Sequence, residues 1–150
     1  MTKRELGENY FSSGYNCAQS VVLAFSEEIG LPKDVLLKLS STFGGGMGRL
    51  REVCGAVSGM FIVLGLLQGY TSPTDNVEKM EVYKKVQDLA NEFKKINGTI
   101  ICRELLGEVE AKTTPTPEQR TAEYYKKRPC KLLVGDACEI LGNWLVNANN

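Results

Sequence analysis

The uncharged segment at residues 53–68 reads VCGAVSGMFIVLGLLQ. No Asp, Glu, Lys or Arg occurs in residues 53–74, but the strongly apolar part is shorter than a membrane span. Serine, glutamine and glycine residues interrupt the run, which favours a buried central helix over residues 51–68 rather than a transmembrane one. Because Gly55 and Gly59 share one face of this helix, we expect a second helix to approach it closely there.

Helix signals flank this segment on both sides. Asn16 is a typical N-cap, and apolar residues then recur at helical spacing until Gly30. Further helices are predicted at residues 34–39, 77–96, 103–106 and 118–127, and from Pro129 onward. In the longest of them, eight apolar residues of period 3.6 are expected to face the core: Val77, Met80, Tyr83, Val86, Leu89, Ala90, Phe93 and Ile96.

The pattern as a whole predicts an all-α fold. No segment shows the alternation of a strand, and the connections between the predicted helices are short. We expect a compact multi-helix bundle that forms a single helical domain over residues 1–150. Residues 108–117, rich in Thr and Pro, are expected to form a mobile loop.

Charge and composition limit the function. The chain has 18 Lys and Arg against 18 Asp and Glu, so no net field attracts nucleic acid or an acidic membrane surface. The first residues are charged and polar where a secretory signal would be apolar, which favours a cytoplasmic location. In that reducing compartment, the five cysteines are more suited to act as ligands, nucleophiles or transient redox groups than as permanent disulfides.

Four of the five cysteines lie near predicted helix starts: Cys17, Cys54, Cys102 and Cys130. Free N–H groups and the helix dipole stabilise an anion at such positions, so each thiol is expected to ionise more easily than a free cysteine. Basic residues beside Cys54, Cys102 and Cys130 act in the same direction. Cys138 lies inside the last predicted helix, and we expect it to pack in the core.

Spacing and composition leave two kinds of chemistry for these cysteines. The chain contains no Cys-x-x-Cys pair, and it contains no histidine, which excludes Cys-His and Ser-His nucleophiles. What remains is thiol–disulfide exchange, or an all-cysteine site for zinc or an iron–sulfur cluster. The same four cysteines are the candidate catalytic residues and, alternatively, the candidate metal ligands.

A glycine-rich loop precedes the central segment. It fails the dinucleotide-binding and P-loop patterns, because Arg49 stands where a glycine is required and no strand precedes it. The simple interpretation is a tight connection between helices. The alternative is an anion-binding nest next to Cys54, with candidate cofactor-binding residues Gly45, Gly46, Gly48 and Arg49.

Five motifs together carry a resemblance to a known family. They are Gly14-Tyr15-Asn16-Cys17-Ala18, Gly44-Gly45-Gly46-Met47-Gly48, Cys54-Gly55-Ala56-Val57-Ser58-Gly59, Cys102-Arg103-Glu104-Leu105-Leu106-Gly107 and Cys130. Over residues 10–141 the chain resembles the redox-active family named for its C_GCAxxG_C_C cysteine pattern. The resemblance implies a redox role for Cys17, Cys54, Cys102 and Cys130, and members are often encoded near transporter genes.

Three functional hypotheses follow. The first is a redox-active protein, a thiol oxidoreductase or electron carrier, that exchanges electrons between dithiol and disulfide, with Cys54 expected at the centre of the site. The second is an iron–sulfur or zinc protein with the same four ligands. The third is a non-catalytic helical adaptor module. The partner would be a redox protein or a transporter-associated protein, and the sequence predicts no oligomeric state.

Overall fold

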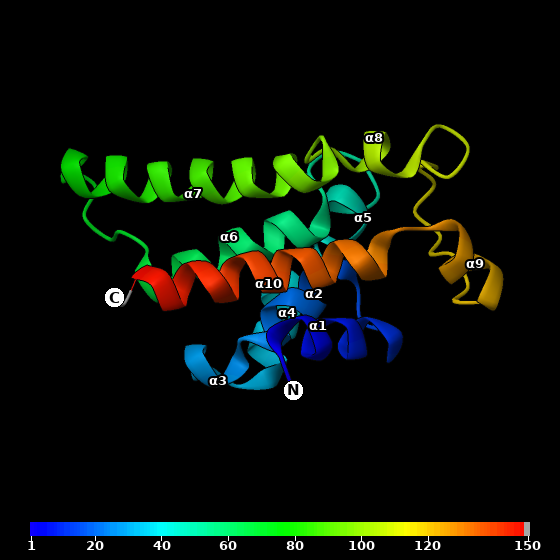
Figure 1. The fold of residues 1–150 in the computed structure, drawn as a ribbon, viewed down its shortest axis with the longest axis horizontal. Helices are drawn as coiled ribbons and strands as arrows, with labels where there is room; N and C mark the ends of the chain where they lie inside the picture. Colours follow the sequence, from blue (N-terminus) through cyan, green and yellow to red (C-terminus); the bar gives the residue numbers. More distant parts are fainter. Residues whose placement is uncertain (149–150) are drawn as a thin grey trace.

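The computed structural model describes residues 1–148, and the regular elements among them are helices (Figure 1). The only strand-like feature among them is an isolated antiparallel bridge between Val53 and Ile101. The all-α prediction is therefore confirmed. The helices are α1 (Lys3–Ser12), α2 (Cys17–Ala24), α3 (Ser26–Ile29), α4 (Lys33–Ser41), α5 (Gly44–Met47), α6 (Gly55–Gln68), α7 (Asn76–Asn97), α8 (Cys102–Leu106), α9 (Ala122–Lys127) and α10 (Cys130–Ala148).

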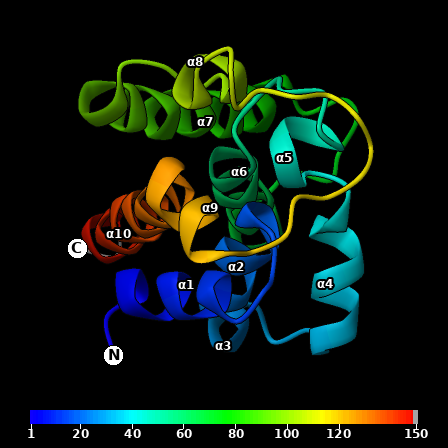
Figure 2. The same ribbon diagram turned by 90° about the vertical axis from the view of Figure 1, so that its right-hand side faces the viewer.

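The uncharged segment forms α6, which lies at the centre of the fold (Figure 2). Helix α2 packs directly on it, as the two glycines predicted. A Cβ atom on Gly59 would lie 2.8 Å from the Cβ of Val21, and one on Gly55 would lie 3.0 Å from the carbonyl oxygen of Phe43. The missing side chains therefore allow the two helices to touch along their backbones.

The other long helices cover this centre. Helix α10 contacts α1, α2, α6 and α7, and α1 and α7 lie on opposite sides of it (Figure 1). Apolar residues from α2, α6, α7 and α10 form one core, whose largest fully buried side chains include Phe25, Met60, Phe93 and Leu141. Among residues 1–148, no helix has both the length and the apolar character needed to cross a membrane.

Several predicted helix boundaries are wrong, for local reasons. The central helix begins at Gly55 rather than near Arg51, because Arg51 has a left-handed φ of 62° and residues 52–54 pair with residues 100–102 instead. The helix predicted from Asn16 to Gly30 is interrupted at Phe25, which closes a tighter turn onto Val22. Helices α9 and α10 begin four residues and one residue later than predicted.

Two helices were not predicted: α1, and the short α5, which lies in the glycine-rich loop. Helix α1 begins with a capping box, in which the Thr2 side chain accepts from the N–H of Glu5 and the Glu5 carboxylate accepts from the N–H of Thr2. The spacing of Thr2 and Glu5 is visible in the sequence, but the segment is so rich in charged and polar residues that no helix was predicted there.

The predicted core face of the longest helix is only partly buried. Leu89, Ala90 and Phe93 are buried as expected, whereas four of the eight predicted residues are exposed, with 52–63% of their surface accessible: Val77, Met80, Tyr83 and Ile96. For Val77, Met80 and Tyr83, Figure 1 shows the reason, since the first turns of α7 extend past the ends of α6 and α10, whereas Ile96 lies in the last turn of α7. These turns have no helix to cover their apolar side.

Candidate functional site

All four candidate cysteines line one cavity of about 220 Å³. Cys17, Cys102 and Cys130 are the first residues of α2, α8 and α10, and Cys54 is the N-cap of α6. The predicted helix-start positions are therefore correct, although Cys54 lies just before its helix and not within the first turn. Helix packing brings four thiols that are far apart in sequence to one pocket.

The backbone around Cys54 and Cys102 aligns these two residues. The N–H of Cys54 donates to the carbonyl oxygen of Ile100 at 2.7 Å, and the N–H of Cys102 donates to that of Glu52 at 2.6 Å. These bonds flank the bridge between Val53 and Ile101. The short antiparallel pairing thus holds the start of α8 against the start of α6.

The start of α2 is held by Asn16. Its side-chain oxygen accepts from the N–H of Gln19 at 2.8 Å, and its Nδ2 donates to the carbonyl oxygen of Ser41 at 3.1 Å. A Cβ atom on Gly44 would collide with the Asn16 side chain, and one on Gly55 would lie 3.2 Å from the Cβ of Cys17. Two glycines of the family motifs therefore make room for the cap and the thiol that follows it.

Cys17 differs from the other thiols in its ionisation. A hydrogen bond with the thiol of Cys130 lowers the pKa of Cys17 to about 6, against the opposing effect of burial. The backbone N–H of Gly45 and the positive charge of Arg120 act in the same direction as the Cys130 thiol. Cys17 is therefore mainly a thiolate at neutral pH.

Cys130 is the proton-bearing partner in this pair. Its hydrogen bond to Cys17, followed by burial, raises the pKa of Cys130 well above that of an ordinary thiol. The two thiols therefore titrate as a pair, in which the Gly45 N–H and Arg120 favour the charge on Cys17.

The other two cavity cysteines remain protonated. Burial, followed by the negative charge of Cys17, raises the pKa of Cys54 to about 12 despite nearby N–H groups of α6. Burial also raises the pKa of Cys102, although Arg51 Nη1 lies 3.7 Å from its Sγ. The prediction that every helix start eases ionisation is wrong for Cys54, Cys102 and Cys130, because the loss of solvation and the neighbouring thiolate outweigh the helix terminus.

Cys138 lies apart from the cavity, as predicted. It is fully buried in α10, and a Cβ atom on Gly7 of α1 would lie 2.5 Å from its sulfur. Burial raises the pKa of Cys138 to about 12, which makes it a poor nucleophile. Its position fits a packing role.

The glycine loop contributes to the cavity only in part. Gly45 and Arg49 line it, whereas Gly46 and Gly48 do not. Gly46 has a left-handed φ of 71° and packs where a Cβ atom would lie 2.6 Å from the Cβ of Cys102. The loop is therefore mainly a tight connection that brings the Gly45 N–H to Cys17, and only Gly45 and Arg49 of the predicted nest reach the cavity.

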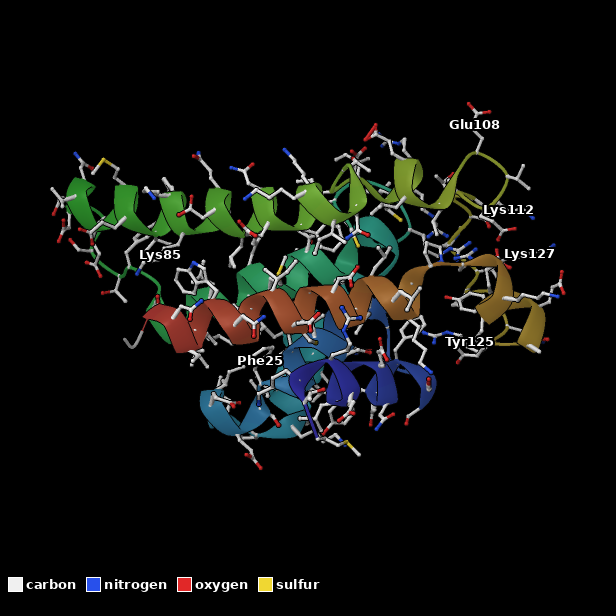
Figure 3. The ribbon with its side chains drawn as sticks, viewed as in Figure 1. Phe25, Lys85, Glu108, Lys112, Tyr125 and Lys127 are labelled. Carbon is white, nitrogen blue, oxygen red and sulfur yellow. The ribbon has the colours of Figure 1, made fainter. Side chains whose placement is uncertain are left out.

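The connection from α8 to α9 closes the cavity on one side. It leaves α8, passes α5 and returns to α9 (Figure 2). Its carbonyl oxygens at Lys112 and Thr114 accept from Arg51 Nε at 2.9 Å and from Arg49 Nε at 2.5 Å. Figure 3 shows Lys112 and Tyr125 at this end of the molecule, while Glu108 projects outward. The mobility predicted for residues 108–117 stays a prediction.

Three residues at the cavity had little or no signal in the sequence. In the sequence, Arg51 and Arg128 are only basic neighbours of cysteines, and Arg120 is far from Cys17 along the chain. Arg120 donates to the carbonyl oxygens of Phe11 and Tyr15, both at 2.9 Å. Only the fold reveals that its charge lies beside Cys17.

The donor set can also be compared with that of a metal centre. Within residues 1–148, no group of three or more His, Cys, Asp or Glu side chains is arranged so that it could hold a metal ion. A four-thiolate site requires four sulfurs arranged tetrahedrally around one point. The zinc and iron–sulfur alternatives for Cys17, Cys54, Cys102 and Cys130 stay predictions.

Comparison with known proteins agrees with the cysteine pattern. The family model described as "Putative redox-active protein (C_GCAxxG_C_C)" matches residues 15–144, which contain all four cavity cysteines. No curated protein and no solved structure matches the chain.

Proposed function

The chain belongs to this family of redox-active proteins, and on that premise we propose that it performs thiol–disulfide exchange at Cys17 and Cys130. The observation that carries the proposal is that Cys17 and Cys130 begin two helices and line one cavity, where the Cys130 thiol is the main cause that lowers the pKa of Cys17. A thiolate is the attacking form in thiol–disulfide exchange, and a second thiol must lie close enough to displace the first product. Cys17 and Cys130 meet both requirements.

In the first step, the Cys17 thiolate attacks one sulfur of a substrate disulfide R–S–S–R′. A bond forms between Cys17 Sγ and the R sulfur, and R′–S⁻ leaves with the electron pair of the broken S–S bond. Cys17 is partly exposed, whereas Cys54, Cys102 and Cys130 are buried. Cys17 is therefore favoured as the attacking cysteine both by its lowered pKa and by its solvent exposure.

In the second step, Cys130 attacks Cys17 Sγ and forms the Cys17–Cys130 disulfide, and R–S⁻ leaves. The hydrogen bond with Cys17, followed by burial, is the main cause of the high pKa of Cys130, and both this bond and the charge of Cys17 are lost in the mixed disulfide. Arg128 then favours the Cys130 thiolate. The protein dithiol loses two electrons, and one proton from Cys130 and one from solvent complete the two product thiols.

Cys54 and Cys102 have a different part in this scheme. Their raised pKa values keep them as neutral thiols that do not compete with Cys17 for the substrate. They fill the cavity wall beside the reacting pair.

The test is to identify which cysteines become oxidised. Reduced protein is treated with one equivalent of 2-hydroxyethyl disulfide at pH 7, free thiols are trapped with iodoacetamide, and disulfide-linked peptides are mapped by mass spectrometry. We expect one new disulfide, between Cys17 and Cys130. The Cys130→Ser variant should accumulate the mixed disulfide on Cys17, and the Cys17→Ser variant should stay reduced.

Cys138→Ala is the matched control, because it removes a buried cysteine outside the cavity. It should form the same disulfide as the unaltered chain. Formation of a disulfide that omits Cys17, or no reaction by folded protein, would contradict the proposal.

A further inference from the structure

The cavity is rich in positive charge. Four arginine side chains line it, from Arg49, Arg51, Arg120 and Arg128, and the carboxylate among the lining residues is that of Glu118. Glu118 is shared, since its Oε1 lies 3.5 Å from Arg49 and 3.7 Å from Arg128. Even with the Cys17 thiolate, the lining has more positive than negative groups.

Arg51 has hydrogen-bonding capacity that the protein does not use. Arg51 is only 3% exposed to solvent. Its Nε donates a hydrogen bond to the carbonyl oxygen of Lys112, and its Nη1 faces Cys102 Sγ. Its Nη2 is buried and has no hydrogen-bond partner among the described residues. A buried, charged donor without a partner is costly, and a bound anion would remove that cost.

The backbone conformation that places Arg51 at this position is strained. Met47, Arg49 and Arg51 all have left-handed φ values, of 68°, 69° and 62°, which are unfavourable for residues other than glycine. Hydrogen bonds from Arg51 N and Glu52 N to the carbonyl oxygens of Gly45 and Gly46 hold this conformation. The strained turn directs two arginines toward the cavity.

Arg120 adds a second positive group beside the nucleophile. Its guanidinium donates to two backbone carbonyls and lies 4.1 Å from the centre of the Phe11 ring. Among the described residues, no carboxylate forms an ion pair with it. Its charge therefore remains available to an anion that approaches Cys17.

The size of the cavity limits the ligand. A volume of about 220 Å³ corresponds to roughly seven water molecules at about 30 Å³ each. A protein disulfide or a long peptide does not fit within it. The cavity therefore suits a small molecule.

Building on the proposed thiol–disulfide exchange, we propose that the substrate is a small sulfur oxyanion containing an S–S bond, bound by Arg51 and Arg120. Tetrathionate represents this class. The Cys17 thiolate attacks one central sulfur of tetrathionate, forms Cys17–S–S–SO₃⁻ and releases one thiosulfate with the electron pair of the broken bond. Cys130 then attacks Cys17 Sγ, releases its proton to solvent and displaces the second thiosulfate. The protein dithiol loses two electrons, and one tetrathionate becomes two thiosulfate ions.

Arg51 allows anion binding to be tested separately from thiolate activation. The charges and hydrogen bonds that lower the pKa of Cys17 come from Cys130, Gly45 and Arg120, and Arg51 is not among these causes. A change at Arg51 should therefore alter substrate preference more than nucleophile reactivity.

The experiment compares an anionic and a neutral oxidant. The rate of Cys17–Cys130 disulfide formation is measured with tetrathionate and with 2-hydroxyethyl disulfide, for the unaltered chain and for Arg51→Gln. We expect the ratio of the two rates to fall about tenfold or more in the variant, as for the loss of one charge-assisted hydrogen bond. Arg103→Gln is the matched control, since that arginine follows Cys102 but its side chain is 50% exposed and pairs with Glu52. Its ratio should stay unchanged.

The two proposals fail in different ways. If neither oxidant produces the Cys17–Cys130 disulfide, the proposed function is wrong. If both do, and Arg51→Gln leaves the ratio unchanged, only the anion site is wrong. Should Arg51→Gln fail to fold, sulfate is added to the unaltered protein at constant ionic strength. Sulfate must then slow the tetrathionate reaction relative to chloride, and equal rates in the two salts would overturn the anion site.

Discussion

At the level of single residues, Cys17 and Cys130 show how position separates two chemically identical thiols. Both begin a helix and both lie in the same cavity. Cys17 also receives a backbone N–H from Gly45 and the field of Arg120, whereas Cys130 is more deeply buried. The charge therefore settles on Cys17, and the remaining proton on Cys130 stabilises it through a hydrogen bond.

This account predicts the pH dependence of Cys17 alkylation. Iodoacetamide reacts with the thiolate, so the rate should rise as the pH increases through about 6 and level off above it. Replacement of Cys130 by Ala removes the main cause of the lowered pKa, so the midpoint should move upward toward the usual thiol value of about 8.5. The measurement is the rate of Cys17 modification, followed by mass spectrometry from pH 5 to pH 9.

Cys130→Ser provides the comparison for that shift. A serine hydroxyl can still donate to the thiolate, so its midpoint should lie below that of Cys130→Ala. Identical profiles for the unaltered chain and both variants would show that the Cys130 thiol does not stabilise the Cys17 thiolate.

The same residues show that helix starts can be predicted from the sequence, whereas the ionisation of their thiols cannot. The caps and breakers around Cys17, Cys102 and Cys130 were enough to predict that these cysteines begin helices, because capping depends on residues only a few positions apart. Their ionisation depends on burial and on contacts such as Arg120 with Cys17, which join residues far apart in the chain. Such contacts cannot be predicted from local sequence patterns.

At the level of elements, the contact between α2 and α6 depends on glycines that lack a side chain. Gly59 faces Val21 and the carbonyl oxygen of Ala18, whereas Gly65 on the same helix has no atom within 4 Å of the position that a Cβ would occupy. Gly59 and Gly65 therefore have opposite roles. The first permits packing, and the second only lowers helix propensity.

Alanine substitutions should separate these two roles. Gly59→Ala should lower the free energy of unfolding by about 1–3 kcal/mol, because the new methyl group overpacks the contact with α2. Gly65→Ala should raise it by roughly 0.5–1 kcal/mol, because alanine favours the helix and meets nothing. Urea unfolding followed by circular dichroism measures both changes. Equal effects of the two substitutions would mean that α2 and α6 do not approach each other at Gly59.

Element boundaries were predictable only where local signals dominate. The capped ends of α2 and α7 lie close to their predicted positions, since Asn16, Asp75 and Gly98 act on their own neighbours. Residues 51–54 were predicted as helix and instead pair with residues 100–102, a partner almost fifty positions away. The exposed side of α7 was likewise not predictable from local signals, because the burial of its apolar residues depends on how far α6 and α10 extend along it.

At the level of the whole molecule, the site exists because four helix starts converge. Helix α2 supplies the thiolate, α10 its partner thiol, and the paired segments before α6 and α8 the two neutral thiols. The sequence identified these four residues and their family resemblance. It could not show that they share one cavity, because their meeting depends on how α1, α2, α6 and α10 pack together.

The same convergence underlies the prediction that the chain unfolds as one domain. Trp144, the only tryptophan, lies in α10 and packs against the shared core, so its fluorescence reports on α10, while far-ultraviolet circular dichroism reports on all helices. Because the core joins residues of α2, α6, α7 and α10, the two signals should follow one transition with the same urea midpoint. The comparison is made on reduced protein, which keeps disulfide formation out of the equilibrium. Two separate midpoints would contradict a single domain and would mean that α10 can detach while the remaining helices stay folded, taking Cys130 away from Cys17.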